Sequence, residues 1–184
     1  LGRDLANHPE IWTITLSSDH VVELQQVMLK VVTGGIELAD IKKKNIPLPS
    51  LGPVLSLLKQ ELLHGRGFIL MRGINTNKLT EREIENIFFG VGLHLGHPRS
   101  QNAAGQILGH VQDLGANGLD HNARIYQTNE RQTFHTDSCD VVGLMCLHKA
   151  MSGGESMLIS ATTIYNAFLE KRPDLLPRLF DPIA

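Results

Sequence analysis

The hydrophobic pattern of the chain changes near Gly96 and Pro98 and returns to a helical one after Ser160, and these changes limit the fold more than any other feature. Before Gly96, apolar residues recur every three to four positions, which is typical of one face of a helix. After Pro98, short apolar segments alternate with Gly, Asn, Asp and Ser, which is typical of strands and turns. Helices followed by clustered strands predict an α+β protein with a mainly antiparallel sheet or a double-sheet jelly roll.

Helices are predicted before the first change and after the second. Ser17 or Ser18 caps the first helix, which ends at Thr33-Gly34-Gly35. A second follows an extended, proline-stiffened connector, residues 45–53. A third begins at the capping box T-E-R-E, residues 80–83. The last helix is capped by Ser160 and is broken at the Arg172-Pro173 pair. Pro173 has no backbone N–H and cannot continue the helical hydrogen bonds.

Strands are predicted mainly between these helices. The apolar run GFILMRG, residues 67–73, predicts a buried strand. The other strand candidates are LGHVQDLG (108–115), ARIYQT (123–128), QTFHTDS (132–138), VVGLMCLHK (141–149) and SMLIS (156–160). We expect one domain over residues 1–184, with a mainly helical flank at 1–66 and a sheet core at 67–184.

Composition narrows the function classes. The chain has 184 residues, a formal net charge of −2, 42% hydrophobic and 20% charged residues. That balance gives no electrostatic reason to expect nucleic acid or a membrane as partner. No apolar run approaches the roughly 18 residues of a membrane span. No signal peptide is visible, and two cysteines imply no disulfide framework, so a cytoplasmic protein is expected.

His135 and Asp137 lie two residues apart in the stretch QTFHTDSCD. In a strand, residues i and i+2 project from the same face, so these side chains would converge. An imidazole nitrogen and a carboxylate oxygen suit a divalent first-row metal. Two His and one carboxylate form the facial triad of non-haem Fe(II) oxygenases. The alternative is a neutral His hydrogen-bonded to an Asp in a loop, and the pair alone leaves both open.

A Gly-Gly turn follows the next apolar segment. Gly153 and Gly154 can adopt positive φ and let the backbone approach a ligand closely. Ser156 then offers a hydroxyl to a carboxylate. The stretch from Phe134 to Ser156 resembles the metal-binding core of the TauD/TfdA family of Fe(II)- and 2-oxoglutarate-dependent dioxygenases, with a fungal branch nearest. The resemblance extends to ELLHGRGFILMRGI (61–74), GLHLGHPRSQNAAGQILGHVQDLG (92–115), RIYQTNERQTFHTD (124–137) and RPDLLPRLFDPIA (172–184).

The resemblance implies a double-stranded β-helix, a clavaminate-synthase-like jelly roll with helical N-terminal flanks, incomplete on its C-terminal side. It implies that His135 and Asp137 are the first two iron ligands and that Ser156 helps to hold 2-oxoglutarate. Asn129 and Arg131 match positions that often contact substrate, although a surface or strand-pairing role fits them too. The implied reaction uses Fe(II), 2-oxoglutarate and O2, hydroxylates a small molecule, and releases succinate and CO2.

The family also needs a second His ligand and an Arg that pairs with the distal carboxylate of 2-oxoglutarate. His148 follows Asp137 but is interpreted as structural, and Arg172 and Arg178 fall in a helical stretch. The chain starts at Leu1 rather than Met and stops at LFDPIA without a polar tail, so we expect a fragment. Because two protein ligands hold Fe(II) less firmly than three, we expect little or no turnover from this chain alone.

The remaining histidines and cysteines are assigned to no site. His94 and His97 have ligand-like spacing at a helix end, where an imidazole is also favoured by the helix dipole. His64, His110 and His121 are isolated and are likewise assigned to no site. Cys146 alternates with apolar neighbours and is expected to be a core thiol.

Two other functions stay open at this point. The chain could be a catalytically inactive jelly roll that acts by binding only. It could also be a metal-dependent hydrolase, although such an enzyme would need a denser ligand set such as H-x-H-x-D. Homo-oligomerisation is open as well, and the substrate is not predicted beyond a small molecule.

Overall fold

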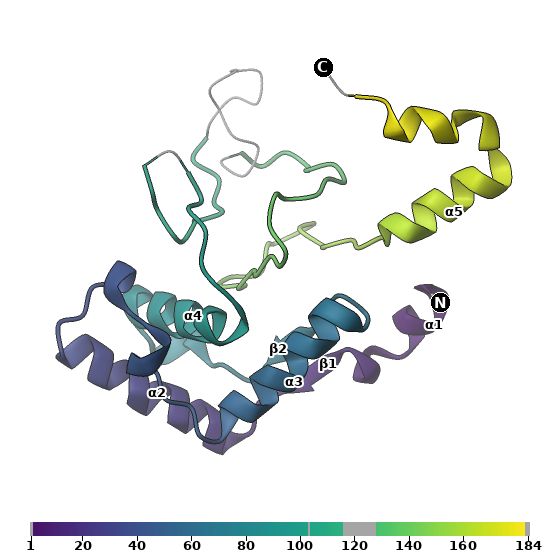
Figure 1. Cartoon of the computed structure of the whole chain (residues 1–184). Coiled ribbons are helices and arrows are strands. Elements are labelled where there is room, and N and C mark those ends of the chain that lie inside the picture. Colours follow the sequence, from purple (N-terminus) through teal and green to yellow (C-terminus); the bar gives the residue numbers. More distant parts are fainter. Residues whose placement is uncertain (1, 103, 116–127, 183–184) are drawn as a thin grey trace. The chain divides into compact units, whose positions relative to one another are not determined.

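The computed structural model describes residues 2–102, 104–115 and 128–182. Its helices and strands are α1 (Gly2–Asn7), β1 (Thr13–Thr15), α2 (Ser18–Thr33), α3 (Leu51–His64), β2 (Leu70–Arg72), α4 (Glu81–Leu95) and α5 (Ala161–Lys171), with short 3-10 turns between them (Figure 1). The chain divides into two compact units, Leu1–Leu147 and His148–Ala184. The described residues therefore mix helix and strand, and the division into a flank and a sheet core stays a prediction.

Helix α2 begins where its cap was predicted. The hydroxyl of Ser17 accepts the backbone N–H of His20 at 3.2 Å, and the His20 ring accepts the Ser17 N–H at 3.4 Å. This reciprocal pair satisfies two backbone donors that a helix start otherwise leaves unpaired. The buried face of α2 is made by residues three and four apart: Leu24, Val27, Met28 and Val31.

Helix α3 begins earlier than predicted. The connector was expected to run through Pro53, but the helix starts at Leu51. Pro53 is compatible with a first turn, because a residue there needs no N–H for the helix. Glu23 of α2 supplies the cap: its carboxylate accepts the backbone N–H groups of Ser50 and Leu51, both at 2.8 Å.

Helix α4 packs against both α2 and α3, and together they enclose the core (Figure 1). Its predicted capping box is confirmed: Thr80 and Glu83 exchange hydrogen bonds, and the Thr80 N–H lies 2.7 Å from the Glu83 carboxylate. Gly90 lies at the tightest contact, since an added Cβ would meet side-chain atoms of Ile46 and Met28 at 2.9 Å. The buried core residues of this unit are Leu16, Leu24, Val27, Met28, Val31, Ile41, Ile46, Leu48, Leu51, Leu55, Ile87, Phe89 and Val91.

The predicted strand at 67–73 is confirmed in its central part. Strand β2 pairs with β1 in parallel, with Ile14 opposite Met71. Leu70 and Met71 are half-buried and Arg72 is exposed, so the strand is less buried than expected. The reason is that β1 and β2 form a two-stranded sheet, which leaves part of their surface uncovered.

The other predicted strands are wrong wherever the structure describes them. Residues 104–115 and 128–159 contain no hydrogen-bonded strand, and segment 123–128 lies almost entirely outside the described residues. A strand needs a ladder partner, and no backbone ladder pairs any two of these segments within the described part of the chain. Apolar side chains there are left exposed, including Phe134, Val142 and Leu144. The jelly roll therefore stays a prediction.

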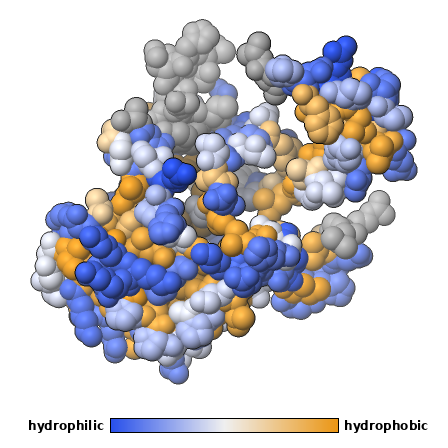
Figure 2. Space-filling view, viewed as in Figure 1, coloured by the Kyte–Doolittle hydropathy of each residue, from blue (hydrophilic) through white to orange (hydrophobic). Residues whose placement is uncertain are grey.

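The unit His148–Ala184 contains α5 and a 3-10 turn, Pro173–Phe180. Ser160 caps α5 as predicted, because its hydroxyl accepts the Thr163 N–H at 3.3 Å. The helix ends before Arg172, as the following Pro requires. Figure 2 shows hydrophobic side chains at the surface over this region; the exposed ones are Ile164, Tyr165, Leu169, Leu179 and Phe180. Among the described residues, no helix has the length and hydropathy of a transmembrane span.

Candidate functional site: a His-x-Asp pair

His135 and Asp137 approach each other closely. The His135 Nε2 atom lies 3.7 Å from the Asp137 Oδ1 atom, and about half of each side chain is exposed, 46% and 52%. The backbone bends at Phe134 and is not a strand, yet the two side chains still converge. One nitrogen donor and one oxygen donor therefore face the same accessible point. Their role as metal ligands stays a prediction.

The hydrogen bonds of His135 define its tautomer. Its Nδ1 atom lies 2.8 Å from the backbone carbonyl of Thr133, which can only accept. Nδ1 therefore carries the proton and donates it. The side-chain amide of Gln132 lies 3.3 Å from Nε2 and donates to the lone pair there. A metal-binding histidine is commonly oriented in this way, with its other nitrogen bonded to a carbonyl. The Nε2 lone pair thus accepts from the Gln132 amide, which a metal would have to replace.

The turn before Ser156 has the backbone geometry that was predicted. Gly153 and Gly154 have φ of 71° and 78°, in the left-handed region that side chains with a Cβ seldom occupy. An added Cβ at Gly154 would lie 3.3 Å from the Cβ of Ala150. Ser156 is exposed. It belongs to the second unit, whereas His135 belongs to the first, so its predicted role toward 2-oxoglutarate stays a prediction.

Asn129 and Arg131 lie just before the pair in sequence, and both are exposed. Exposure is compatible with substrate contact and equally with an ordinary surface role. Their assignment to substrate stays a prediction.

A second cluster was missed by the sequence analysis. The Nε2 atom of His110 lies 3.0 Å from Glu85 and 3.6 Å from Glu81, whose carboxylates project from the first turns of α4. Glu81 and Glu85 are four residues apart and so share a helix face. That spacing was readable in the sequence. The position of His110 beside this helix could not be predicted, because it depends on the path of the irregular chain after Gly96.

Other candidate ligands have structural surroundings. The His94 ring nitrogen Nε2 lies 2.8 Å from the Ile46 carbonyl and ties α4 to the segment before α3. His97 is exposed, and His121 lies outside the described residues. Cys146 was expected to be a core thiol, but this is wrong: both Cys139 and Cys146 are exposed. Among the described residues, no strand packs with the segment around Cys146, so the thiol stays exposed.

Comparison with known proteins decides the family. The sequence model of the "Taurine catabolism dioxygenase TauD, TfdA family" matches residues 33–182. The chain belongs to the TauD/TfdA family. FR-33289 synthase of Streptomyces rubellomurinus is 34% identical over 166 residues, which cover 90% of this chain and 49% of that protein. Taurine hydroxylase-like protein SAT17 of Stachybotrys chartarum is 30% identical over 178 residues, covering 92% and 46%.

This TauD/TfdA chain spans about half the length of the curated relatives it matches. The matched range contains the His135–Asp137 pair, Ser156 and the glycines before it. Among the described residues, no third His, Cys, Asp or Glu joins His135 and Asp137, and the one group of three such residues is Glu81, Glu85 and His110. The described residues thus bring two candidate donors together at His135 and Asp137.

Proposed function

We propose that this TauD/TfdA protein is an Fe(II)- and 2-oxoglutarate-dependent dioxygenase that hydroxylates a small molecule and releases succinate and CO2. Family membership supports an oxygenase in general. The single observation that carries the iron assignment is the approach of the His135 Nε2 atom to the Asp137 Oδ1 atom.

The donor set of the pair fits a ferrous ion. Ligands about 2.1 Å from a metal lie roughly 3.0 Å apart at a right angle and about 3.4 Å apart at a tetrahedral angle. The 3.7 Å between His135 and Asp137 requires a small closure, which two half-exposed side chains can make. The Nε2 lone pair is already directed by the Thr133 carbonyl. Imidazole and carboxylate are the ligand types of non-haem Fe(II) oxygenases.

Each residue then has a defined part. His135 and Asp137 hold the metal, and the Thr133 carbonyl keeps the imidazole in one orientation. The bound Fe(II) would supply activation of O2 together with 2-oxoglutarate. The Ser156 hydroxyl donates a hydrogen bond to a carboxylate of 2-oxoglutarate, and the Gly153–Gly154 turn leaves room for that approach. Asn129 and Arg131 contact the small-molecule substrate.

The proposal requires a third ligand and a cation for the distal carboxylate of 2-oxoglutarate. We place both in a region that the longer relatives contain and this chain does not span. The same region would supply strands that pair with residues 132–138 and 141–149 and complete the family's jelly roll. The exposure of Phe134, Val142 and Leu144 supports this, because packing between the two sheets of a jelly roll would cover such side chains. The 184-residue chain alone is then expected to turn over weakly or not at all.

A binding-only protein is the second candidate. It is favoured by the absence of a third donor beside His135 and Asp137 among the described residues. The two candidates differ in product. If the protein acts by binding only, neither the 184-residue chain nor a longer protein forms succinate, even with Fe(II) and ascorbate present.

The test is anaerobic addition of Fe(II) and 2-oxoglutarate to the chain and to a longer protein that includes the region spanned by the relatives. The longer protein is expected to develop a visible charge-transfer band and, with O2 and substrate, to form succinate. Asp137→Ala should abolish the band. The matched control is Asp140→Ala, which removes an exposed carboxylate three residues away. Equal loss in both variants, or an intact band in Asp137→Ala, would refute the assignment.

A further inference from the structure

The unit His148–Ala184 carries an apolar face that its own residues leave open. On α5 the side chains of Ile164, Tyr165, Phe168 and Leu169 are spaced so that they share one side of the helix. No residue of α5 or of the 3-10 turn that follows it is buried, and the structure describes both elements completely. Because an amphipathic helix normally buries its apolar side, this face needs a partner from outside the unit.

The contact between α5 and the 3-10 turn does not cover this face. The rings of Tyr165 and Phe180 meet edge to face, with centroids 6.5 Å apart and an interplanar angle of 82°. Phe180 nevertheless stays 74% exposed, and Leu169 stays 55% exposed. A helix of 11 residues is only marginally stable in water by itself. The two elements therefore hold each other without forming a core, and their common apolar face depends on further contacts.

The charged residues beside this face balance one another. Residues 161–181 contain three basic and three acidic side chains. Arg172 donates to the two carboxylate oxygens of Asp174 at 2.9 Å and 2.8 Å, and Arg178 donates to Asp181 at 3.0 Å. Surfaces that bind nucleic acid or anionic membranes need an excess of basic side chains. A neutral apolar face instead suits an apolar protein surface.

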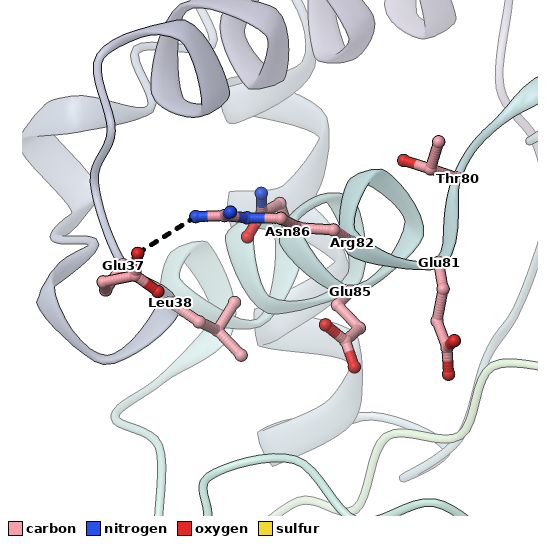
Figure 3. A pocket seen from close by; sticks show the side chains of 7 residues that line it. All are labelled: Glu37, Leu38, Thr80, Glu81, Arg82, Glu85 and Asn86. Atoms are coloured by element: carbon pink, nitrogen blue, oxygen red, sulfur yellow. Dashed lines mark hydrogen bonds and ion pairs between the residues drawn. The ribbon is translucent and has the colours of Figure 1, made fainter.

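The pocket at the start of α4 is not a comparable face. Figure 3 shows mainly polar side chains in its lining, and Arg82 reaches Glu37 at 3.2 Å. Leu38 is the apolar member of that lining. Charged side chains at an open surface are solvated already, whereas the apolar face of α5 gains free energy when it is covered.

The comparisons indicate what covers it. The family model matches residues 33–182, so α5 and the 3-10 turn belong to the TauD/TfdA domain itself and not to a linker beside it. This chain covers 49% and 46% of its two relatives, which are therefore about twice as long. A chain of about 300 residues buries about 75% of its surface on folding, against about 70% for 150 residues. Apolar faces left open by half a domain are the ones that the other half can bury.

We propose that the apolar face of α5 and the 3-10 turn docks against an apolar surface of the part of a full-length TauD/TfdA protein that this chain does not span. Leu169, Leu179 and Phe180 are its anchors, because they are exposed and lie on these two elements. The contact is intramolecular in the longer protein, and the 184-residue chain presents the face to solvent. This inference rests on family membership and does not depend on the iron assignment.

The test is hydroxyl-radical footprinting of the 184-residue chain and of a longer protein that includes the region spanned by the relatives. Leu169 and Phe180 should react in the 184-residue chain and be protected about fivefold or more in the longer protein, because a packed interface core excludes water. The matched control is Leu57 of α3, which is 72% exposed and lies beside exposed Ser56 and Gln60. A single exposed apolar residue of this kind should react equally in both proteins.

A second readout uses stability. Leu169→Ser and Phe180→Ser should each lower the Tm of the longer protein by about 4 °C or more, since each replaces a packed apolar side chain. The same substitutions should change the Tm of the 184-residue chain by less than about 1 °C, as is usual at exposed positions. Leu57→Ser is the control and should behave as an exposed position in both lengths. Circular dichroism checks that every variant is folded.

Three outcomes would overturn the proposal. Equal labelling in both lengths would mean that the face stays in solvent. Protection already present in the 184-residue chain and independent of its concentration would mean that another part of this chain covers the face. Protection that rises with the concentration of the 184-residue chain would mean that a second copy covers it. None of these measurements uses iron or 2-oxoglutarate, so their failure is distinguishable from failure of the dioxygenase assignment.

Discussion

The carboxylate of Glu23 caps the first turn of a helix that lies 28 residues further along the chain: it accepts the backbone N–H of Leu51 at 2.8 Å. Its other oxygen accepts the Ser50 N–H at the same distance. A negative charge at this position also interacts favourably with the helix dipole. Glu23 thereby joins α2 to the start of α3.

Replacing this cap is expected to destabilise the helical unit. Glu23→Ala leaves two N–H groups at the start of α3 without their acceptor and should lower the free energy of unfolding by about 1–2 kcal/mol. Chemical denaturation monitored by circular dichroism measures the change. Glu170→Ala, at an exposed position of α5, is the control and should stay within about 0.5 kcal/mol. Equal effects of the two substitutions would contradict the capping role.

Two glycines of α4 are expected to respond in opposite directions to alanine. At Gly90 the new methyl group would meet Ile46 and Met28 at 2.9 Å, and overpacking of this kind costs about 1–3 kcal/mol. At Gly92 nothing lies within 4 Å, and alanine should stabilise the helix by about 0.5–1 kcal/mol. Thermal unfolding of both variants tests this directly. A stabilising Gly90→Ala would mean that the helices can move apart at no cost.

The capping box of α4 should depend on pH. The backbone N–H of Thr80, and then its hydroxyl, donate to the Glu83 carboxylate and lower the pKa of Glu83 below its ordinary value. A lowered folded-state pKa means that the stabilisation is present above the unfolded-state pKa and is lost as pH falls through the folded-state value.

We therefore expect Glu83→Gln to be less stable than the parent at neutral pH, by on the order of 0.5 kcal/mol because the contact is exposed. The difference should disappear in acid, once Glu83 itself is protonated. Denaturation series at several pH values measure it, with Glu130→Gln as the control. A stability difference between the parent and Glu83→Gln that grows as the pH falls would contradict the lowered pKa of Glu83.

The amide of Gln132 is expected to compete with metal at His135. It donates to the Nε2 lone pair, and that hydrogen bond must break before Nε2 can bind a metal. Removing this hydrogen bond in Gln132→Ala should leave Fe(II) affinity unchanged or tighten it, by up to about fivefold for a bond worth about 1 kcal/mol. Anaerobic Fe(II) titration tests this, with Gln112→Ala as the control. A large loss of affinity would show that Gln132 supports the metal.

Helix starts set by nearby residues were predictable from the sequence. Ser17, the Thr80–Glu83 box and Ser160 each act within three residues of the helix start, so a local pattern was enough. The start of α3 was not predictable, because its cap comes from Glu23 in another helix. A local sequence pattern predicts a helix start that is capped by neighbouring residues. It does not predict a start that is capped by a residue of another helix.

The strand predictions failed because the local pattern was present but no other described strand pairs with these segments. Alternating apolar residues show that a segment suits a sheet, but a strand exists only where another strand pairs with it. Segments 132–138 and 141–149 have the pattern and lack the partner among the described residues. The approach of His135 and Asp137 was nonetheless anticipated from their spacing. The contact of His110 with Glu85 was not, since sequence distance hides it.

The unpaired apolar stretch around Val141, Val142 and Leu144 affects how the protein must be handled. No backbone hydrogen bond joins these residues to other described residues, and their side chains are exposed. Such a stretch can add to an identical one in a neighbouring molecule, edge to edge, as in early aggregation. Concentrated samples are therefore the ones in which insoluble assemblies should start, and a lysine in place of Val142 is the simplest change to keep the molecules apart.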